Sequence, residues 1–220
     1  MQTFQFTFAK SIAWLGLASL MLLMDLRPDV CHAAKDEVDQ VAGRTLDEWT
    51  GDLKSDNEIL RARAAKTLIM FGDKAVEALT QALNDESPAV QYWAAGNLGL
   101  LKTDAQATLR RLQELEGNSA TQPAVATAAA FALCQLEDVD AHIGLLIEQV
   151  QIPDRATACC AADFLQRLGP KAKQAVDVLE QTYEVHSGQK KQQGVEVDYH
   201  IGHACKNALR VIAPEWKPKG

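Results

Sequence analysis

Aromatic and basic residues are scarce in this chain. Phe, Trp and Tyr make up 6% of its 220 residues although 47% are hydrophobic, and Lys and Arg number 22 against 29 Asp and Glu. The hydrophobic residues are mostly Ala, Leu and Val, which suit helices better than a sheet. The net charge of −7 lacks the basic footprint of a protein that binds nucleic acid. Composition therefore indicates a helical protein with no nucleic-acid partner.

Sequence signatures of catalysis are also absent. The chain has no glycine-rich phosphate-binding loop, no glycine pattern of a nucleophile elbow and no Cys-x-x-Cys motif. We therefore predict that the protein is not an enzyme, with no catalytic residue and no cofactor.

Only one stretch is continuously hydrophobic. Residues 12–24 (IAWLGLASLMLLM) follow Lys10; they are too few to span a bilayer but suit the core of a signal peptide. The small residues Ala33 and Ala34 follow, and we expect cleavage after one of them. We assign residues 1–34 to a signal peptide and 35–44 to a polar linker, and expect an exported protein, periplasmic or extracellular, with no membrane contact after cleavage. An uncleaved N-terminal anchor is the alternative.

The cysteines of the mature chain are Cys134, Cys159, Cys160 and Cys205. An even number in an exported protein allows a disulfide framework. All four fall in the first helices of the repeats described next, where partners would sit at mismatched heights, and a bridge between the neighbours Cys159 and Cys160 would be strained. We therefore expect buried free thiols.

A short pattern recurs along the chain: two small residues, then apolar residues three and six positions after the second. It begins at Ala64, Ala94, Ala129 and Ala161, and in a looser form at Ala204. The starts are 30 to 43 residues apart, a period typical of stacked helical pairs, and the offsets put these side chains on one helical stripe. We predict an all-α fold, a right-handed α-solenoid of about five helical hairpins over residues 45–213, with a loose tail at 214–220.

Several helix boundaries are also predicted. Capping-box spacing places helix starts after Thr45 and after Ser55, and Ser87 is the expected N-cap before Pro88. Gly72 should end the first helix of the first hairpin, with its partner helix starting at once.

Three passages of the sequence carry a family resemblance: Arg61–Ala65, Ala75–Leu79 and Val90–Ala95. They resemble HEAT repeats of the type first grouped with phycobilisome bilin lyases. Together with Thr45–Trp49, they are similar to the HEAT module associated with secreted bacterial sulfatases. The resemblance implies an α-solenoid whose second helices line the concave surface, and a protein partner that is a secreted sulfatase or another envelope protein.

The same resemblance implies no enzymatic activity for this chain. Neither the sulfatase nucleophile motif nor the His-Glu dipeptides of dimetal HEAT hydroxylases occur in the sequence. We therefore expect a non-catalytic scaffold for protein–protein interaction. A bilin-lyase-like accessory enzyme, for which Cys159 and Cys160 are the available thiols, and a glycan-associated binding protein are the alternatives. The oligomeric state stays open.

The predicted binding residues lie between the apolar positions of the second helices, where helical periodicity turns them to solvent. Acids outnumber bases among them, so we expect a partner with basic or neutral polar groups; a solvated face without a partner is the alternative. We call these residues the docking surface: Glu77, Gln81, Arg110, Gln113, Glu114, Glu148, Asp177, Glu180 and Gln181.

Three further features are weaker candidates. The polar insertion 185–194, with Lys190 and Lys191, is either a contact loop or a disordered excursion. Tyr92 and Trp93 suit core packing better than carbohydrate stacking.

The histidines near the C-terminal end form the third candidate. His200 and His203, with Asp198, Cys205 and His186 nearby, are the best approximation to a metal site. Because Cys205 should point into the core, we predict no metal.

Overall fold

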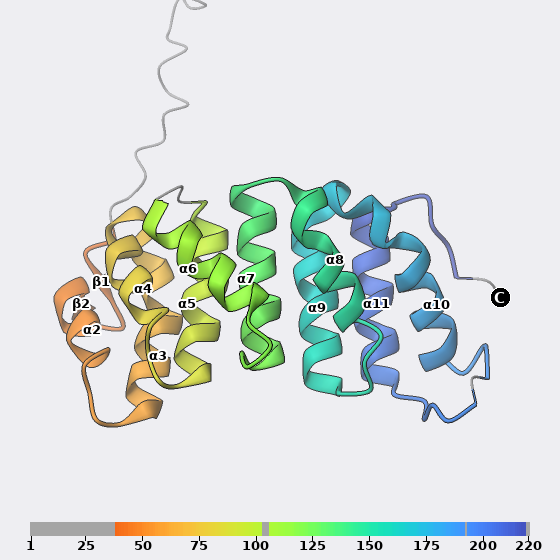
Figure 1. The fold of residues 1–220 in the computed structure, drawn as a ribbon, viewed down its shortest axis with the longest axis horizontal. Coiled ribbons are helices and arrows are strands. Elements are labelled where there is room, and N and C mark those ends of the chain that lie inside the picture. The colour runs from red at the N-terminus through yellow and green to blue at the C-terminus, as the bar shows by residue number, and fades with distance from the viewer. Residues whose placement is uncertain (1–37, 103–105, 192, 219–220) are drawn as a thin grey trace, which may run out of the picture. The chain divides into compact units, whose positions relative to one another are not determined.

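The computed structural model describes residues 38–102, 106–191 and 193–218, and the predicted signal peptide lies outside them. Val38 onward forms one compact unit. Its helices stand side by side in a row of two layers (Figure 1). No helix among the described residues is long and apolar enough to cross a membrane.

The N-terminal end of the row is closed by a short hairpin and a helix. Strands β1 (Gln40–Val41) and β2 (Arg44–Thr45) pair antiparallel, and helix α2 (Leu46–Asp52) follows with the predicted capping box between Thr45 and Glu48. Trp49 is 1% exposed and donates its indole N–H to the Val41 carbonyl at 3.0 Å. The segment expected to be a polar linker therefore contains a hairpin that packs onto α2.

The first hairpin begins two residues later than the capping-box pattern predicts. Helix α3 (Glu58–Leu68) has Asn57 as its N-cap, and the Asn57 side chain accepts the Ile59 N–H at 2.9 Å. The Ser55 hydroxyl instead accepts the Asn57 N–H at 3.1 Å. The prediction of Ser55 as the N-cap was wrong because Asn57, two residues further along the chain, also carries a capping oxygen, and the helix begins after it.

Four helical hairpins follow one another in the described chain, and α11 closes the row. This confirms the predicted all-α repeat architecture, although among the described residues α11 has no second helix of its own. The first helices are α3, α5, α7, α9 and α11; the second helices are α4, α6, α8 and α10. Their bounds, beyond those given above, are α4 (Val76–Ala82), α5 (Pro88–Leu101), α6 (Gln106–Gly117), α7 (Pro123–Leu136), α8 (Val139–Gln149), α9 (Arg155–Leu168), α10 (Val176–His186) and α11 (Tyr199–Ile212).

Two of the hairpin turns are 3₁₀ segments, η2 (Ile69–Ala75) and η3 (Gly169–Ala175). Each contains a glycine at positive φ, Gly72 at 60° and Gly169 at 59°, a backbone conformation that glycine adopts without steric cost. Gly72 therefore interrupts the helix as predicted. The partner helix α4 begins at Val76 rather than immediately after Gly72, because the 3₁₀ turn occupies the residues between.

The paired small residues of the repeats are buried where neighbouring first helices meet. Both alanines of each regular pair have no exposed surface, and each first helix packs against the next from α3 to α11. The approach is closest between α5 and α7, where a Cβ added to Gly99 would lie 2.7 Å from the Ala132 Cα. Small side chains thus set the spacing of the first-helix layer.

The second-helix layer is joined across repeats by polar contacts. The Thr80 and Thr108 hydroxyls bond at 2.7 Å between α4 and α6. The Glu116 carboxylate lies 2.8 Å from the His142 Nδ1, which joins α6 to α8. Successive repeats are therefore held by apolar packing on one side and hydrogen bonds on the other.

The C-terminal segments pack back onto the row. The insertion expected at 185–194 starts later, because α10 continues through His186, and the Lys190 N–H bonds the Glu184 carbonyl at 2.9 Å. In the predicted loose tail, the Trp216 ring contacts that of Tyr183 edge to face at 5.3 Å. Residues up to Trp216 therefore belong to the folded unit.

Candidate functional site

The structure places every residue of the docking surface on a second helix. Glu77 and Gln81 lie on α4; Arg110, Gln113 and Glu114 on α6; Glu148 on α8; Asp177, Glu180 and Gln181 on α10. All are exposed except Glu180, which is half-buried. The helical periodicity of the sequence therefore identified the solvent side of this layer correctly.

The docking surface is acidic, and its central part is held in place by neighbours. The Glu114 carboxylate accepts from the Arg111 guanidinium at 2.9 Å, and the Gln113 amide donates to the Glu137 carboxylate at 3.1 Å. Arg110 is the one base in the set against Glu77, Glu114, Glu148, Asp177 and Glu180. Such a surface attracts cationic groups and repels polyanions.

Small cavities open beside both ends of the second-helix layer. Gln81 lines one of about 180 Å³ between α2 and α4, together with Lys54 and Asp85. Gln181 lines one of about 200 Å³ at the other end. These two glutamines occupy equivalent places in α4 and α10, in the sequences Val76–Gln81 and Val176–Gln181.

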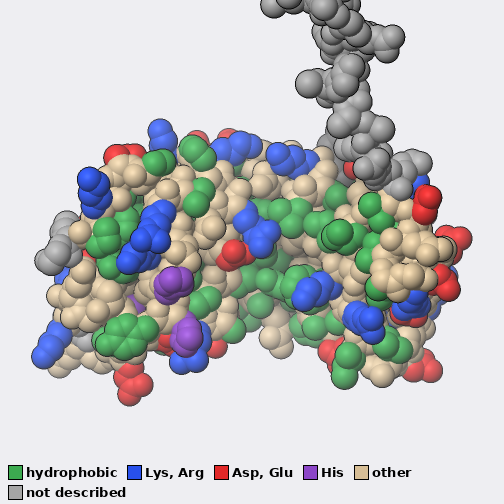
Figure 2. Space-filling model, turned by 180° about the vertical axis from the view of Figure 1, so that it is seen from behind, with side chains coloured by type: hydrophobic (Ala, Val, Ile, Leu, Met, Phe, Trp, Pro, Cys, Tyr) green, Lys and Arg blue, Asp and Glu red, His purple; other side chains and the backbone are tan. Residues whose placement is uncertain are grey.

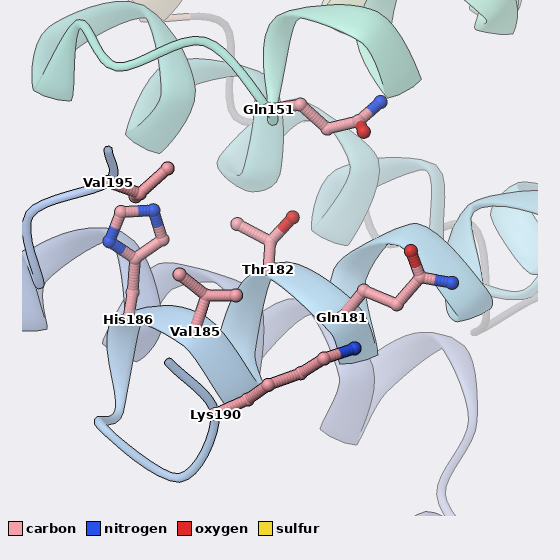
Figure 3. A pocket seen from close by; sticks show the side chains of 7 residues that line it. All are labelled: Gln151, Gln181, Thr182, Val185, His186, Lys190 and Val195. Carbon is pink, nitrogen blue, oxygen red and sulfur yellow. The ribbon is translucent and has the colours of Figure 1, made fainter. Parts of the chain in front are cut away.

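The cavity beside Gln181 is built from α10, the turn after α8 and the insertion that follows α10. Thr182, Val185 and His186 line its floor, Gln151 reaches in from the opposite side, and Lys190 extends from the insertion (Figure 3). The Lys190 ammonium and the two glutamine amides give this cavity several hydrogen-bond donors.

His186, in the floor of this cavity, is held by a backbone hydrogen bond. Its Nδ1 accepts the Asp198 N–H at 3.0 Å, so its Nε2 carries the proton of the neutral ring. Burial lowers the pKa of His186 below its usual value, with a smaller opposing contribution from Asp198. The ring is therefore held neutral and serves as a packing and hydrogen-bonding group.

The sequence alone identified only some of the residues that line this cavity. Lys190 and Gln181 were singled out, the first by the insertion and the second by helical periodicity. Gln151 and Thr182 were missed: Gln151 lies in a turn without a distinctive motif, and Thr182 sits at an apolar position of α10. Only the packing of distant segments brings them together.

The candidate metal ligands do not converge. His200 and His203 are exposed on α11, whereas Cys205 is buried and His186 is engaged with the Asp198 backbone. Across residues 38–102, 106–191 and 193–218, no group of three or more His, Cys, Asp or Glu side chains could hold a metal ion.

The four cysteines in the described ranges are free thiols. Burial raises the pKa of Cys134 and of Cys205 to about 12 and that of Cys160 to about 11. Burial also raises the pKa of Cys159. Because the thiolate is the reactive form, these side chains are poor nucleophiles at neutral pH.

Comparison with known proteins bears on the N-terminal half of the row. Residues 46–120, which cover α2 to α6, match the family model of HEAT repeats. The match is confined to this part of the row. A search of the curated proteins finds no match.

A solved structure is similar to this chain at low identity. Human deoxyhypusine hydroxylase in complex with glycerol is 18% identical, with 76% of this chain and 85% of that chain covered and a TM-score of 0.36. At that TM-score the likeness supports no conclusion about activity.

Proposed function

We propose that the protein is an exported, non-catalytic HEAT-repeat scaffold that binds a protein partner on its docking surface. HEAT repeats generally mediate protein–protein interactions, and stacked repeats offer extended surfaces for them. The observation that carries the proposal is the series of exposed acidic side chains on successive second helices, from Glu77 on α4 to Asp177 on α10.

The partner has basic or neutral polar groups on the surface that it presents. Complementary charges speed association and suppress binding of partners with the wrong sign. The residues at Thr45–Trp49 and Val90–Ala95 resemble the HEAT module of secreted sulfatases, so a secreted sulfatase is the first partner to test. Export rests on the apolar run at residues 12–24.

The experiment is affinity capture from the cell envelope with the tagged full chain, followed by mass spectrometry. The test variant carries Glu114→Lys and Glu148→Lys. The matched control carries Glu196→Lys and Glu215→Lys, which change net charge equally at exposed sites outside the docking surface.

We expect the control to capture the same partner as the native chain and the test variant to lose it. Capture that survives the test variant would place binding on another face, and equal loss in both variants would reduce it to a net-charge effect. Co-purification of a chromophore with bilin-like absorbance would contradict the non-catalytic scaffold and favour the lyase-type alternative.

A further inference from the structure

The outward side of the first helices, which we call the first-helix face, has the opposite charge to the docking surface. Lys and Arg side chains spread across it, with hydrophobic side chains gathered near its middle (Figure 2). The bases include Arg63 and Lys66 on α3, Arg167 on α9, and Lys206 and Arg210 on α11. Asp163, an acid of this face, is paired with Arg167 at 2.6 Å.

This face has a recess over α7, which arises from the residue that precedes the paired small residues of each repeat. The residue just before the small pair is Arg63 in α3, Trp93 in α5, Ala128 in α7, Cys160 in α9 and His203 in α11. Because Ala128 is short, the outward side of α7 forms a depression, and side chains of α5 and α9 meet across it. The Tyr92 hydroxyl and the Cys160 thiol bond across α7 at 3.1 Å.

Aromatic rings fill the space above the middle of α7. The Phe164 ring stacks on that of Phe131 at 4.5 Å and lies 6.1 Å from that of Tyr92. A Cβ added to Gly96 would contact the Phe164 ring at 3.7 Å. The cavity on this face lies towards the amino ends of α5, α7 and α9, where Pro88, Gln122 and Ala156 line it.

The open part is an apolar cavity of about 310 Å³, lined among others by Trp93, Val125, Ala156 and Cys160. The Lys66 ammonium lies 4.7 Å from the centre of the Trp93 ring, so positive charge borders the cavity on the α3 side. Ligand pockets run from about 300 to 1,000 Å³. This one has the size for a single large side chain.

We propose that the first-helix face binds an acidic protein segment that places one apolar side chain in this cavity. Its carboxylates then lie over Lys66 on one side and over Lys206 and Arg210 on the other. Apolar anchors buried in pockets carry most of the energy of protein interfaces, and charges around them set orientation and specificity. The site is separate from the docking surface and accepts the opposite kind of partner.

The cavity itself favours a protein segment over a nucleic acid or a sulfated polysaccharide. Its lining is apolar and aromatic, and the bases lie outside it on different helices. Duplex DNA and sulfated polysaccharides bind mainly through contacts between their charged groups and basic side chains, whereas a single strand can also stack its bases on aromatic rings and is therefore a competitor in the test below. An acidic segment with an apolar residue uses both features.

The experiment titrates the full chain into fluorescent peptides and follows anisotropy. The first probe is a peptide of Glu and Asp residues around a central Leu-Trp pair. A second probe has Ser in place of that pair, and a third has Lys in place of the acids. We expect binding of the first probe only, at low ionic strength.

Ala156→Glu is the test variant. It adds a carboxylate at the cavity rim, and as the second residue of α9 a Glu is compatible with folding because the amino end of a helix favours negative charge. Ala107→Glu is the matched control, since Ala107 is exposed at the same position of α6 in the other layer. Ala156→Glu should lower the affinity for the first probe by roughly tenfold or more, because like charges oppose binding. Ala107→Glu should leave this affinity unchanged.

Four results of the binding measurements would overturn the proposal. The first three are no binding of the first probe, equal binding of the Ser-substituted probe, and equal effects of the two variants. The fourth is that heparin or single-stranded DNA displaces the probe and binds the Ala156→Glu variant as tightly as the native chain. Sedimentation tests one more occupant: self-association of the native chain that Ala156→Glu abolishes would assign the cavity to a second copy, against the proposal. Glu114→Lys with Glu148→Lys should leave the probe bound, which separates this site from the proposed function.

Discussion

At the scale of single residues, the fold depends on which side chains are small. Gly99 faces the Ala132 backbone across the interface of α5 and α7, with no room for a Cβ. Gly144 in α8 is exposed, and a Cβ there would meet nothing within 4 Å. The two helical glycines therefore have opposite roles: one sets the distance between helices, and the other only weakens its own helix.

Gly99→Ala should destabilise the protein by roughly 1–3 kcal/mol, because the added methyl group forces α5 and α7 apart. The control, Gly144→Ala, should be neutral or stabilising by up to about 1 kcal/mol, because alanine is the better helix former. Urea unfolding followed by circular dichroism measures both. Equal stability of the two variants would contradict the close approach of α5 and α7 at Gly99.

The buried thiols predict how stability depends on pH. In the folded chain burial raises the pKa of Cys134 and Cys205 to about 12, whereas an unfolded thiol titrates near 9.0. Between these values the unfolded chain loses protons that the folded chain keeps, so stability is intact below pH 9 and falls as pH rises. The fall approaches about 1.4 kcal/mol per thiol for each pH unit.

Urea unfolding at several pH values between about 8 and 11 tests this expectation. The double variant Cys134→Ala with Cys205→Ala should lose stability less steeply than the native chain over this range. Identical pH profiles would mean that the two thiols ionise as readily in the folded chain as in the unfolded one.

At the scale of elements, the sequence predicts much of the repeat row, but not the β1–β2 hairpin before α2 or the packing of the tail. Pairs such as Ala94-Ala95 mark the first helices by periodicity alone, and the Thr45 capping box fixes the start of α2. The tail was mispredicted because Trp216 packs on Tyr183, a contact that local sequence does not encode. The exposure of the proposed docking residues could be predicted from the period of the second helices, but the cavity beside Gln181 could not, because it needs Gln151 and Lys190 from separate segments.

The start of α3 gives an element-scale prediction. Asn57→Ala should destabilise the protein by about 1 kcal/mol, because the Ile59 N–H loses the side-chain oxygen that caps the helix. Ser55→Ala should cost less, since its hydroxyl caps no helical N–H and its carbonyl, which accepts from Arg61, remains. Thermal unfolding of the two variants compares them, and a larger loss for Ser55→Ala would restore Ser55 as the cap.

At the scale of the whole folded unit, the two layers differ in how they pack and in their charge. The first helices are joined by small apolar residues and carry a basic outer face with a recess, whereas the second helices are joined by polar pairs and carry acids. The HEAT resemblance assigns the concave surface to the second helices. The recess over α7 lies on the first-helix face, where side chains of α5 and α9 meet across α7.

The central claim is that the acidic side chains of the second helices hold the protein partner. Hydrogen exchange with mass spectrometry, on the purified full chain with and without the captured partner, tests it most directly. The account predicts slower exchange in α6 and α8, which carry Glu114 and Glu148, with the first helices unchanged. Protection confined to α5 and α9, or none in any second helix, would contradict it.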